Sequence, residues 1–263
     1  MEKKDICRIF ESCISGRKTS VEESSLKELS IADWENIIGL SRDLGVTLLI
    51  YQGIRNSQLL PALIPADILT KFKKIYTNTT AQKIRLLYNT LKIIKLLLEN
   101  NIQAITLKGF SIAEDLYGDI AARPFADIDL LVKKQDIIKA GRLLLSIGYK
   151  ESTPYWEKIA IGTFHNSPPF LSNKRPIVDL HWNLVDADNT VKVDIDGLWK
   201  RSRLTMLGNA EVKALSLDDM LLYACIHISS HHRFRVNFIS LCDIARIIEL
   251  HDADFDWNTV IEC

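Results

Sequence analysis

The sequence predicts an α+β fold with a mixed-sheet core at about residues 101–200, flanked by helical regions at 1–100 and 201–263. Three observations support this prediction. Apolar residues recur at three- and four-residue intervals before residue 100, short β-like runs alternate with helical segments in the middle, and the helical period returns after about residue 216. Strand, helix, strand, helix and then several strands is the order of a mixed sheet with helices packed on it.

The N-terminal helical region contains two clear segments. Ser30 or Asp33 can cap a helix through IADWENIIGLSRDLG, which would end at Gly45. The segment 57–101 is rich in apolar residues at helical spacing. We expect it to end at Asn100 and Asn101. One face of its later part carries Leu87, Leu91, Ile94 and Leu98.

The core begins with a strand-like run at Ile102–Leu107, followed by the short helical stretch FSIAEDLYG. A second strand is expected at Asp127–Val132, and a helix from about Gln135 to Ser146 ends at Gly148. Three further β-like pieces are expected around Tyr149, at Ile159–His165 and at Pro176–Trp182.

The C-terminal region has two helical segments, LDDMLLYACIHISSHH and FISLCDIARIIEL. Ser216 precedes Asp218 and Asp219, which favours a helix start at this point because a serine caps the first amides and the acids suit the positive end of the helix.

Composition and charge exclude several classes of protein. Lys plus Arg and Asp plus Glu both number 33, so a general nucleic-acid binder is not expected. Five cysteines without a CxxC pair do not indicate a disulfide framework or a zinc site. The N-terminus lacks an apolar secretory segment, and Lys92 and Lys95 interrupt the richest apolar stretch. We expect a cytoplasmic protein with no membrane partner.

Three carboxylates predict a metal site. Asp127 and Asp129 lie two apart in an apolar strand, so their side chains share one face. Asp179 lies in a second apolar run, PIVDLHWNL, and on a neighbouring strand it would complete a site for two ions about 4 Å apart. We expect Mg²⁺, or Mn²⁺, bound by all three residues, with Asp179 also placed to act as a general base. The alternative is a pair of polar residues on a solvent-facing strand.

The turn after the first strand predicts a phosphate site. Gly109 lets the backbone approach a ligand closely, and the amides of the following helix, with the Ser111 hydroxyl, can bind the β- and γ-phosphates of a nucleotide. Lys108 or Arg123 would add positive charge. The alternative is an ordinary turn between a strand and a helix.

Several histidines are candidates for supporting roles. His181 lies two residues from Asp179 and shares its face, so we expect it to contact the nucleotide or the acceptor, with a structural sheet histidine as the alternative. His227 and His231 have helical spacing without an evident third zinc ligand. We expect one of them to bond Asp243 near the site.

These motifs resemble the nucleotidyltransferase superfamily related to DNA polymerase β, in which a glycine turn precedes an Asp-x-Asp pair and a distant third carboxylate. More narrowly, residues 80–250 resemble the uncharacterised nucleotidyltransferase group. The matching motifs are LKG at 107–109, LY at 116–117, Arg123, DIDLLV at 127–132, GY at 148–149, His165 and DLHW at 179–182. The resemblance implies metal-dependent transfer of a nucleoside monophosphate, with release of pyrophosphate, and does not fix the acceptor.

We therefore expect a nucleotidyltransferase that moves AMP from ATP, the donor favoured by its abundance, to a small molecule or a protein side chain. An alternative is a catalytically weak or inactive member that binds a nucleotide or a partner. It is motivated by Phe110, which replaces the second small residue of the turn, and by a short C-terminus. Nucleic-acid tailing is disfavoured by the neutral charge.

Overall fold

The computed structural model describes residues 29–57, 60–231, 238–251 and the single positions 253, 255 and 257. Within these residues the chain forms a seven-stranded mixed sheet with the strand order β3-β4-β5-β2-β1-β7-β6. The strands are β1 (Ala104–Thr106), β2 (Ile128–Val132), β3 (Lys150–Glu151), β4 (Phe170–Leu171), β5 (Val178–His181), β6 (Arg203–Leu207) and β7 (Ala210–Ala214). The predicted α+β class and mixed sheet are confirmed.

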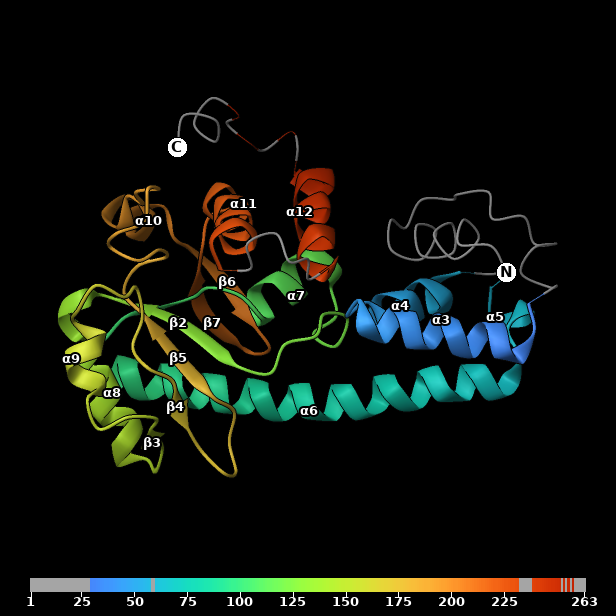
Figure 1. Cartoon of the computed structure of the whole chain (residues 1–263), viewed down its shortest axis with the longest axis horizontal. Helices are drawn as coiled ribbons and strands as arrows, with labels where there is room; N and C mark the ends of the chain where they lie inside the picture. The colour runs from blue at the N-terminus through green and yellow to red at the C-terminus, as the bar shows by residue number, and fades with distance from the viewer. Residues whose placement is uncertain are drawn as a thin grey trace.

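Helices cover both faces of this sheet (Figure 1). Before the sheet come α3 (Ile31–Asp43), α4 (Thr47–Asn56), α5 (Leu60–Leu63) and α6 (Ala66–Glu99). Within and after it come α7 (Phe110–Tyr117), η1 (Lys134–Asp136), α8 (Ile137–Ser146), α9 (Trp156–Ala160), α10 (Ile195–Arg201), α11 (Leu217–Ile226), η2 (His227–His231) and α12 (Phe238–His251). Helix α6 runs along one face, whereas α7, α10, α11 and α12 lie on the other (Figure 1).

The predicted helix boundaries at the N-terminal side are confirmed. Ser30 caps α3, because its hydroxyl accepts a bond from the Asp33 amide at 3.2 Å and the Asp33 carboxylate accepts one from the Ser30 amide at 3.0 Å. Gly45 follows the end of this helix in the left-handed region, with φ at 73°. Asn100 caps the C-terminus of α6, and Asn101 also adopts a positive φ, at 58°.

The packed face of α6 is offset from the predicted one. Leu86, Ile93 and Leu97, together with Ile94, are buried against the sheet, whereas Leu98 is exposed. The buried positions repeat the predicted spacing one residue earlier, at Leu86, Thr90, Ile93 and Leu97, which is a rotation of about 100° around the helix axis. None of the described helices has the length and apolarity that crossing a bilayer requires.

Pairing among the central strands determines which polar side chains share one face of the sheet. β2 pairs with β1 in antiparallel fashion and with β5 in parallel fashion, and the second register sets Asp129 opposite Asp179. On the opposite face of β2, Ile128, Leu130 and Val132 are buried in the core that includes α6 and α8. Alternation along a strand therefore puts both aspartates on the face away from α6.

The strand expected at Ile159–His165 is wrong, because α9 ends at Ala160 and covers its beginning. Trp156 explains the helix. Its ring is buried and packs edge-on against Phe170, with 5.2 Å between centroids, and it lies over Gly141 of α8, where an added Cβ would come within 2.4 Å of it. Burial of one large ring outweighs the weak β-propensity of this short run.

The sheet extends beyond residue 200. β6 and β7 form a hairpin within the region expected to be helical, and β7 adds to the sheet in parallel with β1, with Ile105 opposite Lys213. Gly208 makes the tight turn between Leu207 and Ala210, with φ at 59°. A Gly-Asn pair between alternating residues is a hairpin signal, so local sequence does indicate this hairpin.

Candidate active site

Three carboxylates meet on the polar face of β2 and β5. One oxygen from each of Asp127, Asp129 and Asp179 lies within 4.8 Å of the others. Asp127 directly precedes β2, and the register of the parallel pair sets Asp129 beside Asp179. Residues at one register position of neighbouring strands point to the same face, so the pairing itself assembles the cluster.

The cluster has a strong imbalance of charge. Partial burial, with the negative charges of Asp129 and Asp127, raises the pKa of Asp179 to about 6, and Lys108 offsets only part of this effect. Burial also acts to raise the pKa of Asp129. However, the hydrogen bond to His181 and the charge of Lys108 outweigh burial and hold that pKa well below its ordinary value. One carboxylate is therefore fully ionised, and its neighbour resists ionisation for lack of a compensating cation.

His181 and Lys108 both contact Asp129. The His181 Nε2 atom and the Lys108 Nζ atom lie 3.0 Å and 3.4 Å from the same Asp129 carboxylate oxygen, Oδ1. The His181 ring is buried, and its Nδ1 atom has no hydrogen-bond partner among the residues that the structure describes. A carboxylate can only accept, so the His181 Nε2–H group donates to Asp129 and orients it.

His165 lies beside His181, with 5.4 Å between the ring centroids. Its Nδ1 atom lies 2.6 Å from the Asp186 carboxylate. Burial lowers the pKa of His165, although its hydrogen bond to Asp186 acts in the opposite direction. The two rings thus extend the polar face of β5 away from the carboxylates.

The glycine turn lies at the start of α7. Gly109 has φ at 65°, and a Cβ at this position would come within 2.9 Å of the Phe125 ring. Only glycine meets both conditions without strain. Phe110 is buried and packs edge-on against Phe125, with 4.8 Å between centroids, so the large residue in this turn serves the core.

Ser111 is turned into the protein. Its buried hydroxyl shares a hydrogen bond with the Thr106 hydroxyl of β1. The side chain is therefore engaged inside the fold, and the backbone amide of Ser111 is the group that remains for the predicted phosphate contact. Lys108 lies in the same turn, directly before Gly109.

Arg123 lies deeper and binds a C-terminal helix. Its Nε atom donates to Asp243 of α12 at 2.7 Å, and the Tyr117 hydroxyl donates to the other oxygen of that carboxylate at 2.9 Å. The bond that the sequence predicts from Asp243 to His227 or His231 stays a prediction, because the His231 side chain lies outside the described residues. Arg123 and Asp243 are both buried, so the pair joins the segment before β2 to α12.

Two residues near the carboxylates are not among the expected site residues. Tyr223 of α11 is buried, and burial followed by the negative charges of the three aspartates raises its pKa well above the ordinary value. Lys83 of α6 is also buried, and Asp127 is among the charges that act on its pKa. Lys83 lies four residues before Leu87, so an isolated lysine in the apolar pattern of that helix is the signal that the sequence offers.

Comparison with known families places this geometry in context. The sequence model of a family described as uncharacterised nucleotidyltransferase matches residues 30–263. The matched interval contains the three carboxylates, the glycine turn and both helical regions around the sheet. No curated protein matches the chain.

Proposed function

Because this chain belongs to the uncharacterised nucleotidyltransferase family, we propose that it is a Mg²⁺-dependent enzyme that transfers AMP from ATP to an acceptor. The observation that carries the proposal is the approach of Asp127, Asp129 and Asp179 to within 4.8 Å of one another, on the same side of the sheet as the Gly109 turn. A single carboxylate on a strand would not distinguish a site from a solvated face, whereas three that converge, with the pKa of Asp179 raised and that of Asp129 lowered, favour a site.

The residues present fit a divalent cation. Three carboxylates supply the hard oxygen donors that Mg²⁺ and Mn²⁺ prefer, and a bound cation would offset the burial and the neighbouring negative charges that raise the pKa of Asp179. When bound by Asp127, Asp129 and Asp179, the ion would neutralise the charge that develops on the reacting phosphates.

The chain's own groups have separable roles. The amides at the start of α7, beside Gly109, would hold the β- and γ-phosphates, and Lys108 would add positive charge. Asp179 would accept the proton of the acceptor hydroxyl or amine as that atom bonds to the α-phosphorus. The bond from the α-phosphorus to the oxygen that bridges to the β-phosphorus breaks, and pyrophosphate leaves with the electron pair. His181 would keep Asp129 in position throughout.

A binding experiment tests the proposal. Titration calorimetry with α,β-methylene-ATP, which cannot be cleaved at the reacting bond, should show binding that requires Mg²⁺. Asp127→Asn should weaken that binding at least about tenfold, equivalent to about 1.4 kcal/mol. Asp188→Asn, which makes the same change at an exposed position outside the site, should bind like wild type.

Equal binding by wild type and Asp127→Asn would refute the proposed role of the carboxylates. If the nucleotide binds as expected but no radioactivity from α-labelled ATP reaches any acceptor in a metabolite and protein extract, the chain is a nucleotide-binding module. That is the alternative function for a protein of this fold.

A further inference from the structure

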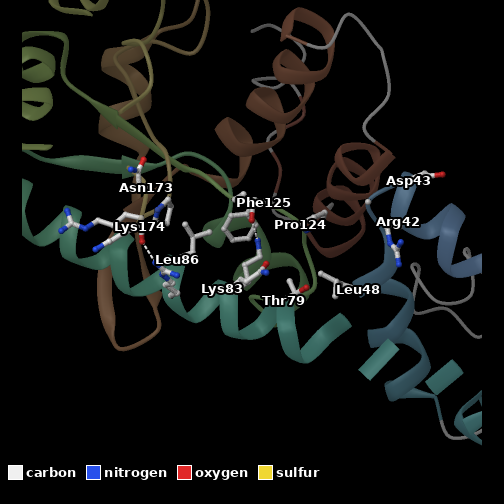
Figure 2. Close-up of a pocket in the computed structure, with 16 residues that line it drawn as sticks. Arg42, Asp43, Leu48, Thr79, Lys83, Leu86, Pro124, Phe125, Asn173 and Lys174 are labelled. Carbon is white, nitrogen blue, oxygen red and sulfur yellow. Dashed lines mark hydrogen bonds between the residues drawn. The ribbon is translucent and has the colours of Figure 1, made fainter. Parts of the chain in front are cut away.

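A pocket of about 990 Å³ lies between α6 and the segments that lead into β2 and β5 (Figure 2). Its walls come from the middle of α6, the end of α3, the segment 124–126 and the loop 173–176 that leads into β5. Segment 124–126 runs directly into Asp127, and loop 173–176 leads to Asp179. The three carboxylates do not line the pocket, but Ala126 in its wall directly precedes Asp127, and the charge of Asp127 acts on Lys83 in the same wall.

The pocket is strongly basic. The charged residues that line it are Arg42, Asp43, Lys83, Arg85, Lys174 and Arg175. Five are cations and one is an anion, in a chain whose net charge is zero. Among the described residues, none of the five cations forms an ion pair with a carboxylate. We call this feature the basic pocket.

Some of these cations are held by backbone oxygens. Arg85 donates to the carbonyl of Lys174, which joins α6 to the 173–176 loop, and Arg175 donates to the carbonyl of Ile147. A carbonyl fixes the direction of a cation without cancelling its charge. The positive charge of the basic pocket is thus ordered and left for another group to neutralise.

Lys83 is the deepest cation of the basic pocket. It is only 2% exposed, its ammonium donates to the Phe125 carbonyl, and its Nζ atom lies 3.1 Å from the centroid of the Phe125 ring. Burial first, and then the charge of Arg123, lowers the pKa of Lys83 to about 7. At neutral pH this amine is only partly protonated, so a bound anion in the pocket would favour its charged form.

The basic pocket and the phosphate turn are neighbours but are distinct. The Phe125 ring contacts the Gly109 turn and also contacts Lys83. Neither Lys108 nor any residue of the turn lines the pocket. Because the turn is assigned to the triphosphate, the pocket beside Asp127 is left for the second substrate.

Resting on the proposed function, we propose that the basic pocket is the acceptor site and that the acceptor is a small molecule carrying a phosphate group. The volume is that of a small-molecule site. Several unpaired cations suit a phosphate ester, which carries nearly two charges near neutral pH, better than a single carboxylate. Arg42 and Arg85 carry guanidinium groups whose forked donors match phosphate oxygens, whereas the Arg175 guanidinium contacts the Ile147 carbonyl and the Tyr149 ring.

Inorganic phosphate is a suitable probe, with acetate at equal ionic strength as the comparison. Titration calorimetry on the full chain, with Mg²⁺ and α,β-methylene-ATP already bound, should show phosphate binding and much weaker acetate binding. Lys83→Met and, separately, Arg85→Gln should each weaken phosphate binding about tenfold. Lys92→Met makes the same change at an exposed position of α6 and should leave phosphate binding unchanged.

Phosphate binding that is equal in wild type, Lys83→Met and Arg85→Gln would overturn the proposal, as would equal affinity for acetate and phosphate. Phosphate that competes with the nucleotide analogue would assign the pocket to the triphosphate, which also overturns it. Failure of wild type to bind the analogue with Mg²⁺ is a separate readout. It would refute the proposed function itself, and the acceptor assignment with it.

Discussion

Replacing Asp179 with asparagine should stabilise the metal-free protein at neutral pH, although it removes a charged group from a candidate active site. The pKa of this carboxyl is about 6 in the folded protein against an ordinary 3.8, because of burial and then the charges of Asp129 and Asp127. A raised carboxyl pKa means that the native state favours the protonated form. The ionised form therefore destabilises the native state increasingly as pH rises from about 4 to about 6, and fully above that.

The expected magnitude follows from the same values. The difference between 3.8 and about 6 corresponds to about 3 kcal/mol, and screening of the partly exposed side chain reduces this to about 1–2 kcal/mol. For a chain of this size the melting temperature in EDTA at pH 7.5 should rise by about 3–6 °C. Near pH 4 the variant and wild type should melt together, since the wild-type carboxyl is then largely protonated.

Thermal unfolding followed by circular dichroism measures this effect, with Asp188→Asn as a control that should not shift. Adding Mg²⁺ should stabilise wild type more than Asp179→Asn, because only wild type retains all three donors. The electrostatic reasoning would be refuted if the melting temperature of Asp179→Asn is below that of wild type at pH 7.5 in EDTA. It would also be refuted if Mg²⁺ raises the melting temperatures of the two proteins equally.

Three further substitutions test other parts of the site. Asp129→Asn should lower the free energy of unfolding, measured in urea, by about 1–3 kcal/mol, because it removes the negative charge that a buried histidine and a lysine share; no loss would show that this charge is unimportant to the fold. Gly109→Ala should lower the free energy of unfolding by about 1–3 kcal/mol and abolish binding of the nucleotide analogue. The added Cβ would clash with Phe125, and the residue has a positive φ. Normal binding of the analogue would show that the turn is not part of the site. Asp243→Ala should lower the free energy of unfolding, measured in urea, by about 3–5 kcal/mol, because Arg123 stays buried without its carboxylate partner. A smaller loss would show that water replaces the carboxylate.

Much of the site follows from strand periodicity. Asp127 and Asp129 are two residues apart in an apolar run, and this spacing alone places them on one face of a strand. The contribution of Asp179 depends in addition on which strands are neighbours. That pairing is set by the parallel register of β2 and β5, a long-range contact that local patterns do not encode.

Other features depend on packing that the sequence does not show. The expected strand at Ile159–His165 gives way to α9 because Trp156 fills the space over Gly141. The Ser111 hydroxyl, expected at the phosphate, instead bonds Thr106 because that face of α7 is buried. The role proposed for Lys83 depends on how α6 crosses the segment before β2, which no helical pattern could reveal.

The proposed function depends on one cation shared by three carboxylates beside a bound nucleotide. A crystal structure of the protein with Mg²⁺ and α,β-methylene-ATP tests this most directly. We predict an ion about 2.1 Å from oxygens of Asp127, Asp129 and Asp179, with the β- and γ-phosphates on the amides after Gly109. A nucleotide bound elsewhere, or bound here with no ion among the three carboxylates, would contradict the proposed function.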